Sequence, residues 1–180
     1  VECTIKDNLV FIYGEASTMA NLDYESIAKS VLKDIGYNDE FHFIIKVSKQ
    51  SKEINSAASI GAGDQGIMFG YACNETEEYM PLPITLAHIT LQELAKIRRE
   101  NPSPMPYLRP DAKSQFTIEY NKKREPVRIH TIVISTQHDE FDSEDVMLAK
   151  IKSDVQNILL PRVISQLDEK NRTLFDDNFI

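Results

Sequence analysis

A glycine-rich loop, Gly61-Ala62-Gly63-Asp64-Gln65-Gly66, is the segment of the chain best suited to chemistry. Its bare pattern is G-x-G-x-x-G, which dinucleotide-binding and phosphate-binding loops use to bring backbone amides close to a phosphate. A dinucleotide site requires a strand directly before the loop and a helix directly after it. Small polar residues precede this loop and a strand-like run follows, so the context disfavours that interpretation. A plain glycine turn between strands remains an alternative, although Asp64 has small neighbours and could approach a ligand closely.

Other polar residues could take part in chemistry, but each has an ordinary structural explanation. Glu15 follows an apolar run, and a carboxylate at the end of a strand is usually solvated. Lys113 lies two residues after Asp111, and such a pair is commonly a surface ion pair of little consequence. His130 and His138 do not have the spacing of metal ligands, so the sequence predicts no metal for either.

The first elements that must position these residues form a predicted β-α-β unit. The apolar run 9–13 predicts a buried strand. Asp23 suits the N-cap of a helix whose apolar residues recur at helical spacing, and Gly36 suits the left-handed position after its end. Alternating apolar and polar residues over 41–48 predict a second strand with one buried face. The polar segment 48–66 predicts a surface loop.

The middle of the chain predicts another strand and a long helix. Residues 67–72 have the composition of a strand. Pro81 and Pro83 lead into a helix, because proline is tolerated in a first helical turn. The apolar face of this helix is expected to hold Ile84, Ala87, Leu91, Leu94 and Ala95. Four prolines between 102 and 110 predict an extended linker.

A hairpin and a final helix are predicted in the last third. The strands are 116–120 and 127–135, and alternation predicts that the odd-numbered residues of the second strand share one face. Asp142 or Ser143 suits the N-cap of a long helix, which Pro161 is expected to kink or end.

The whole composition is that of an ordinary globular protein. With 180 residues, 42% of them hydrophobic, the chain can bury one full core or two small ones. A net charge of −8 without a run of basic and aromatic residues predicts no nucleic-acid partner. Two cysteines, and no apolar run near the ~20 residues that a bilayer needs, predict a cytoplasmic protein without a membrane segment. The start at Val1, without an initiator Met, is expected to mark a piece of a longer protein.

The longer string Ile60-Gly61-Ala62-Gly63-Asp64-Gln65-Gly66-Ile67-Met68-Phe69-Gly70-Tyr71-Ala72 resembles the signature of methionine adenosyltransferases (S-adenosylmethionine synthetases) almost letter for letter. Further segments resemble the same family in the same order: Tyr13-Gly14-Glu15, Lys49-Gln50-Ser51, Met80-Pro81-Leu82-Pro83-Ile84, Leu108-Arg109-Pro110-Asp111-Ala112-Lys113-Ser114-Gln115 and Ser135-Thr136-Gln137-His138-Asp139. The resemblance runs from about Glu2 to about Pro161.

This resemblance implies binding positions for two substrates. Glu15, Gln50 and Asp64 match the family's methionine-binding positions, and Asp111 and Lys113 match its ATP-binding positions. The residue types suit these tasks. A zwitterionic amino acid needs a carboxylate for its ammonium group and an amide donor for its carboxylate, whereas a ribose needs an acceptor and a polyphosphate needs a cation.

The resemblance also implies a reaction, cofactors and an assembly. The methionine sulfur would attack the 5′ carbon of ATP to form S-adenosylmethionine, with release of phosphate and pyrophosphate. Mg²⁺ and K⁺ are the implied cofactors, and Glu2 would be the carboxylate near the K⁺. The implied assembly is a homodimer or homotetramer.

The chain departs from the family pattern in three places. The family's His-Pro-Asp-Lys motif is expected upstream of Val1, so no catalytic residue and no magnesium ligand is assigned within the chain. The later glycine-rich segments that hold the triphosphate are expected after Ile180. The loop between Asn55 and Gly61 is shorter than the family's mobile loop, which leaves open whether this loop gates the site as it does in the family.

Three interpretations follow from these matches and departures. The first is a fragment of a working synthetase. The alternative from another functional class is a non-catalytic family member that acts as a binding or regulatory subunit. The third is an unrelated nucleotide-binding module that shares only the glycine loop, which the other ordered segments disfavour.

The expected fold class is α+β, with two-layer sheets that carry helices on one face. It is expected to be S-adenosylmethionine synthetase-like and incomplete relative to the family. Residues 1–55 would form a β-α-β part of one domain, 56–73 the glycine-rich substrate loop and a following strand, and 74–180 a second domain of helix, hairpin and helix.

Overall fold

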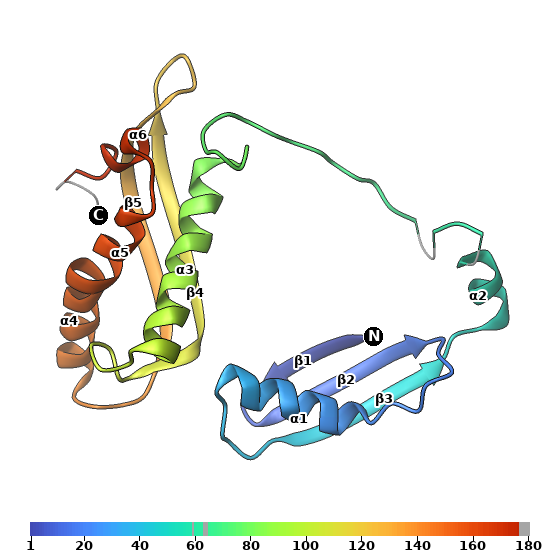
Figure 1. Ribbon diagram of the computed structural model, residues 1–180. Coiled ribbons are helices and arrows are strands. Elements are labelled where there is room, and N and C mark those ends of the chain that lie inside the picture. Colours follow the sequence, from blue (N-terminus) through green and yellow to red (C-terminus); the bar gives the residue numbers. More distant parts are fainter. Residues whose placement is uncertain (59, 63–64, 177–180) are drawn as a thin grey trace. The chain divides into compact units, whose positions relative to one another are not determined.

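The computed structural model describes residues 1–58, 60–62 and 65–176. Its contacts divide the chain into two compact units, Val1–Phe69 and Gly70–Ile180, which we call the N-terminal and C-terminal units. Each unit combines helices with a small sheet, so the expected α+β class is confirmed (Figure 1). The boundary between the units falls inside the expected segment 56–73. None of the helices in the described part of the chain is long and apolar enough to span a bilayer.

The N-terminal unit is built on a three-stranded sheet with the order β1-β2-β3 (Figure 1). Its strands are β1 (Glu2–Lys6), β2 (Leu9–Ala16) and β3 (His42–Lys49). β2 pairs antiparallel with β1 and parallel with β3. The two strands expected from the sequence are thus present, and they are direct neighbours.

Helix α1 (Tyr24–Ile35) connects the two parallel strands and ends where the sequence predicted. The Asp23 carboxylate accepts a hydrogen bond from the backbone N–H of Ser26 at 3.1 Å, which satisfies one of the free amides of the first turn. Gly36 has a φ of 111°, and its N–H bonds to Leu32 and Lys33, so it closes the last turn in a left-handed conformation.

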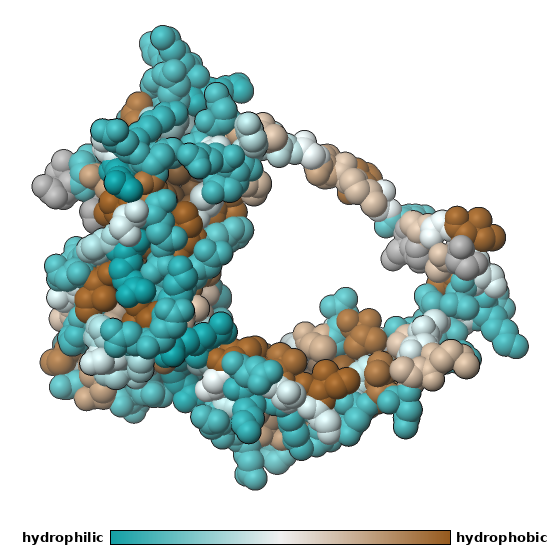
Figure 2. Space-filling model, in the orientation of Figure 1, coloured by the Kyte–Doolittle hydropathy of each residue, from teal (hydrophilic) through white to brown (hydrophobic). Residues whose placement is uncertain are grey.

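The face of the sheet toward α1 holds the small core of this unit. Val10 and Ile12 are 6% and 3% exposed, whereas α1 has no buried residue. An apolar groove of about 320 Å³ lies between α1 and the strands β1 and β2, and Ile27 and Val31 line it while remaining about half exposed. Figure 2 shows the hydrophobic residues that gather between α1 and β1.

Gly14, near the end of β2, has a conformation that side chains rarely adopt. Its φ is +126°, and a Cβ at this position would lie 3.2 Å from the Cα of Val1. The strand can therefore continue to Glu15 only because residue 14 has no side chain.

We expect Gly14→Ala to destabilise the N-terminal unit by about 1–3 kcal/mol, because alanine would add backbone strain and a close contact. Gly70→Ala is the control, since a Cβ there meets nothing within 4 Å. Urea denaturation of both variants measures the change in the free energy of unfolding. Equal stabilities for the two variants would contradict the role assigned to Gly14.

The polar segment after β3 contains a helix that the sequence analysis missed. α2 (Lys52–Ala58) forms where a surface loop was expected. The Ser51 hydroxyl accepts a hydrogen bond from the N–H of Ile54 at 3.3 Å, and the Ser51 carbonyl accepts one from Asn55 at 3.0 Å. Ser51 therefore acts as an N-cap within a stretch whose composition favours turns.

The expected strand over 67–72 does not form in the structure. Residues 65–73 are without regular structure, and Ile67, Met68 and Phe69 are more than four-fifths exposed. A strand needs a neighbour to satisfy its backbone groups, and this segment has no strand partner among the described residues. Its composition alone therefore predicted the wrong structure.

The C-terminal unit places helices on one face of a hairpin. Its elements are α3 (Leu82–Glu100), β4 (Leu108–Tyr120), β5 (Pro126–His138), α4 (Glu144–Asp154), the π-helix η1 (Val155–Leu159), α5 (Leu160–Ser165) and α6 (Glu169–Arg172). Residues of α3, of both strands and of the segments after α4 share two hydrophobic clusters. Both the predicted long helix and the predicted hairpin are confirmed.

The long helix α3 begins at a cap that comes from the preceding loop. The N–H of Leu82 donates to the Glu75 carboxylate at 2.8 Å, and Pro83 lies in the first turn, where no intrahelical N–H is required. The predicted apolar face was partly wrong. Ile84 is 40% exposed, whereas the polar residues Thr90 and Glu93 are buried.

The hairpin contains a β-bulge that the alternation in the sequence does not reveal. Thr117 of β4 pairs with Thr131, but the next residue, Ile118, pairs with Ile129. His130 is the extra residue on β5, and such an insertion reverses which face the following side chains occupy.

The bulge corrects the predicted face of the second strand. Ile129 is fully buried, but beyond the bulge Ile132 and Ile134 pack toward the helices. Val133, expected on the same face as Ile129, is 48% exposed. The odd-numbered residues over 127–135 therefore do not share one buried face.

Two proline-containing segments behave differently from each other. The segment expected as an extended linker is a packed turn, in which Met105 and Tyr107 are 1% and 5% exposed and β4 already includes Pro110.

Pro161 has the expected effect on the last long helix, because the regular α-helix ends before it and is replaced by the π-helix η1. Proline lacks the N–H that a regular turn would use.

The buried carboxylate of Glu93 joins α3 to α5. It accepts hydrogen bonds from Lys96 Nζ at 2.6 Å, from Arg162 Nε at 2.8 Å and from Gln166 Nε2 at 2.6 Å. Burial by itself would raise the pKa of Glu93. The three donors outweigh burial, so the pKa lies below the ordinary value of 4.5.

We expect Glu93→Ala to lower the free energy of unfolding by about 1–3 kcal/mol at neutral pH, because it leaves Arg162 of α5 and Gln166, directly after α5, without their acceptor. A carboxyl whose pKa is depressed in the folded state stabilises the protein above its unfolded pKa and loses this effect as the pH falls. The difference between wild type and variant should therefore shrink below about pH 4.5. Exposed Glu100, at the end of the same helix, is the control, and its replacement by Ala should change stability by under about 0.5 kcal/mol. A difference that stays constant with pH would contradict this account.

Candidate functional site

The predicted residues Glu15 and Gln50 lie at the same end of the two parallel strands. Glu15 pairs in register with Ser48, and Ala16 with Lys49, so the two chains leave the sheet side by side. Gln50, half-buried, follows β3 directly. Alternation along the strands puts Glu15 on the face opposite Val10, Ile12 and α1. This carboxyl end of parallel strands is a common place for ligand binding in α/β units.

Ser17 lies next to these residues and was not singled out from the sequence. Its hydroxyl donates a hydrogen bond to Gln50 Oε1 at 3.2 Å, across 33 positions of sequence. Ser17 follows Glu15 at the alternating spacing that keeps both on one face. That spacing is the only signal by which the sequence could have indicated it.

Glu2 brings a second carboxylate toward this end of the sheet. It is exposed in β1 and pairs in register with Tyr13. Directly paired residues on antiparallel strands share a face, so Glu2 is a diagonal neighbour of Glu15. The structure thus places Glu2, Glu15 and Gln50 at one end of the sheet, where β2 and β3 finish. Asp64 lies outside the described residues.

Asp111 and Lys113 belong to the other unit, on strand β4. Both are exposed. Between Leu108 and Ala112 the pairing with β5 is irregular, and the N–H of Asp111 donates to Gln137 Oε1 at 3.5 Å. The hydroxyl of Ser114 donates to the Ala87 carbonyl of α3 at 2.8 Å, so its neighbour Lys113 points away from that helix.

A hollow beside Asp111 contains two arginines that the sequence analysis did not assign. It measures about 160 Å³, and Arg98 of α3 and Arg109 of β4 line it together with Asp111. Arg109 also forms an ion pair with Asp139 at 3.4 Å. Guanidinium groups bind phosphate oxygens through paired donors, so the hollow offers cationic groups that a polyphosphate could use.

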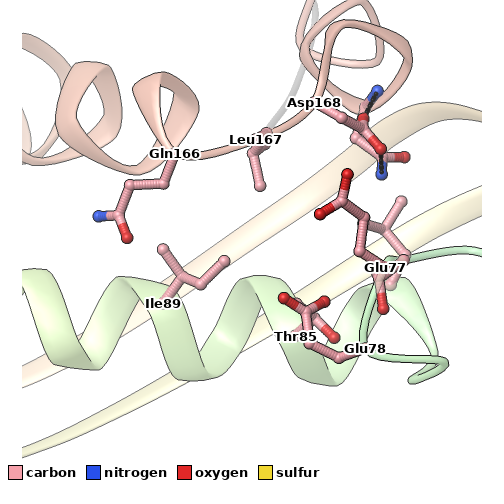
Figure 3. A pocket seen from close by; sticks show the side chains of 10 residues that line it. Glu77, Glu78, Thr85, Ile89, Gln166, Leu167 and Asp168 are labelled. Atoms are coloured by element: carbon pink, nitrogen blue, oxygen red, sulfur yellow. Dashed lines mark hydrogen bonds between the residues drawn. The ribbon is translucent and has the colours of Figure 1, made fainter.

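A second hollow in the C-terminal unit is polar and acidic. It measures about 260 Å³, and Figure 3 shows Thr85 and Ile89 of α3 facing Gln166, Leu167 and Asp168, with Glu77 and Glu78 near one end. Of the predicted site residues that the structure describes, none lines it.

The described residues offer no complete metal site. Nowhere in 1–58, 60–62 and 65–176 do three His, Cys, Asp or Glu side chains gather so that they could hold a metal ion. Glu2 was predicted to lie near a K⁺. It is exposed, and β1 contains no other carboxylate.

Two tyrosines are hydrogen-bond donors rather than acids or bases. Burial raises the pKa of Tyr107, and its hydroxyl donates to Asp154 at 2.8 Å. Burial likewise raises the pKa of Tyr120, which donates to Glu75 at 2.9 Å. Both phenols stay protonated near neutral pH, so they stabilise the fold by holding carboxylates in place.

Comparison with known proteins identifies the family. Residues 59–177 match the family described as S-adenosylmethionine synthetase, central domain. The S-adenosylmethionine synthase of Parabacteroides distasonis is 45% identical over 99% of the chain, that of Flavobacterium johnsoniae 47% over 98%, and that of Porphyromonas gingivalis 44% over 98%. The chain spans 45–47% of the length of these relatives. The match covers nearly every residue from the first strand to the last helix, and the chain therefore belongs to the S-adenosylmethionine synthetase family.

Proposed function

We propose that this chain is part of an enzyme that forms S-adenosylmethionine from ATP and L-methionine and releases phosphate and pyrophosphate. The observation that carries the proposal is the meeting of Glu15 and Gln50 at one end of the parallel strands in a chain of this family. A carboxylate and an amide at the same end of two neighbouring strands suit the ammonium and carboxylate groups of a free amino acid.

Methionine would bind through its charged groups at this edge. Gln50 would donate its amide hydrogens to the substrate carboxylate, and Glu15 would accept from the ammonium group, together with Asp64. Fixing both charged groups of the amino acid orients the sulfur for attack on the 5′ carbon of ATP. Such positioning lowers the barrier by removing rotational and translational freedom before the reaction.

ATP would be held by residues of β4. Asp111 would accept a hydrogen bond from the ribose, and Lys113 would contact the phosphates. Arg98 and Arg109, which border the hollow beside Asp111, could add positive charge. Displacement of a triphosphate builds negative charge on the leaving group, so nearby cations favour the reaction.

Mg²⁺ and K⁺ belong to the proposal as cofactors. Mg²⁺ would neutralise the phosphates, and Glu2 would contribute one carboxylate oxygen to a K⁺ site. The part that we propose for Glu15, Gln50, Asp111 and Lys113 is to bind and orient the two substrates.

The remaining parts of the proposal concern architecture and setting. We infer an S-adenosylmethionine synthetase-like arrangement in which 1–55 and 74–180 belong to different domains, joined by the substrate loop 56–73. We also infer a homodimer or homotetramer in the cytoplasm, without nucleic-acid or membrane partners.

Binding of methionine to the purified chain tests the amino-acid site. Calorimetry should detect weak binding, and Gln50→Ala should weaken it about tenfold or more, because a hydrogen bond to a charged group is lost. Lys122→Ala, in the hairpin turn, is the control and should bind as wild type does. Equal affinities for wild type and Gln50→Ala would exclude the assigned amide contact.

A chimera tests the activity itself. The chain would replace the matching segment of the Parabacteroides distasonis synthase, and size-exclusion chromatography and circular dichroism would verify folding. We expect Mg²⁺-dependent formation of S-adenosylmethionine, and Lys113→Ala should lower kcat/KM for ATP by about tenfold or more. A folded but inactive chimera that still binds methionine would instead support a non-catalytic binding subunit.

A further inference from the structure

Ser17 is placed to control which atoms of the Gln50 amide face a ligand. Its hydroxyl donates to Gln50 Oε1 at 3.2 Å. An amide has a carbonyl that accepts and an NH₂ group that donates, and the two can exchange places by a half-turn. With Oε1 bonded to Ser17, the group left for a ligand is the Nε2 donor.

The turn after β2 holds Ser17 in this place. Thr18 Oγ1 accepts a hydrogen bond from the N–H of Ala20 at 3.0 Å, which closes a short turn directly after Ser17. The parallel register carries Ala16 alongside Lys49, so the next residues of the two chains, Ser17 and Gln50, meet across the end of the sheet. Both the turn and the pairing thus fix the hydroxyl relative to the amide.

The orientation decides which ligand group the edge can accept. A substrate carboxylate accepts hydrogen bonds and is repelled by a carbonyl oxygen, so it binds only if the NH₂ group faces it. Without the Ser17 bond, the amide could present either end, and part of the population would reject the carboxylate. An amide that is already oriented also loses less freedom when the ligand binds.

We propose that Ser17 is a positioning residue for the amino-acid carboxylate, which it selects by fixing the Gln50 amide with Nε2 toward the ligand. The proposal rests on the proposed function, because it takes Gln50 as the carboxylate contact. It goes further in assigning a residue that touches no substrate and in predicting which part of the ligand senses its loss.

Calorimetry with two ligands tests this proposal on the full 180-residue chain. L-methionine carries the carboxylate. L-methioninol keeps the ammonium group and the sulfur, but an alcohol replaces the carboxylate. Ser17→Ala should weaken methionine about three- to tenfold and leave methioninol nearly unchanged. Ser17→Thr, which keeps a hydroxyl, should restore most of the affinity. Ser30→Ala, a matched change at an exposed serine of α1, should have no effect.

The outcomes separate this proposal from the proposed function. If Gln50→Ala weakens methionine but Ser17→Ala does not, only the assignment of Ser17 is overturned. If Ser17→Ala weakens both ligands equally, Ser17 shapes the site without orienting the amide, and the proposal is also wrong. If Gln50→Ala leaves methionine binding unchanged, both proposals fail.

A ligand-free measurement gives an independent test. The side-chain amide signal of Gln50, assigned by its absence from Gln50→Ala, should show restricted motion in the ¹⁵N heteronuclear NOE of the wild type. Ser17→Ala should lower this NOE and Ser17→Thr should restore it. An NOE that is equally low in wild type and in Ser17→Ala would overturn the proposal.

Discussion

The parallel pairing of β2 with β3 is the constraint on which the candidate amino-acid site depends. Parallel neighbours cannot be joined by a tight turn, so the chain must cross over through α1 before β3 begins. The caps at Asp23 and Gly36 mark where the helix of that crossover begins and ends. Because both strands run in the same direction, Glu15 and Gln50 lie at the same end of the sheet although they are 35 positions apart in the sequence. No local feature of either strand produces this meeting.

The two units differ in how they obtain stability. In the described part of the N-terminal unit, the hydrophobic residues that are buried are Val10 and Ile12, and α1 contributes none. The C-terminal unit has two clusters of buried residues and buries Glu93 between α3 and α5. Burying a carboxylate costs free energy unless its lone pairs are satisfied, and three donors satisfy it here. This interaction fixes how the last helices lie against α3.

Much of the fold could be predicted from local signals. The Asp23 and Gly36 caps, the prolines at the start of α3 and the alternation over 41–48 each act within a few residues, and the two helix ends and the strand formed as expected. The buried face expected of that strand did not form, because no residue of β3 is buried. Errors arose where the outcome depended on distant partners. The run 67–72 has strand composition but no neighbouring strand, and the bulge at His130 is visible only once β4 and β5 are in register.

The candidate site divides in the same way. The sequence by itself determined the family, through the glycine loop and the ordered segments around it, and with the family it indicated Glu15, Gln50, Asp111 and Lys113 as residues of interest. Residue type and order along the chain are enough for that. The tertiary structure alone decided that Ser17 bonds to Gln50 and that Arg98 lies beside Asp111. Those contacts join residues far apart in the sequence, so they exist only after strands pair and helices pack.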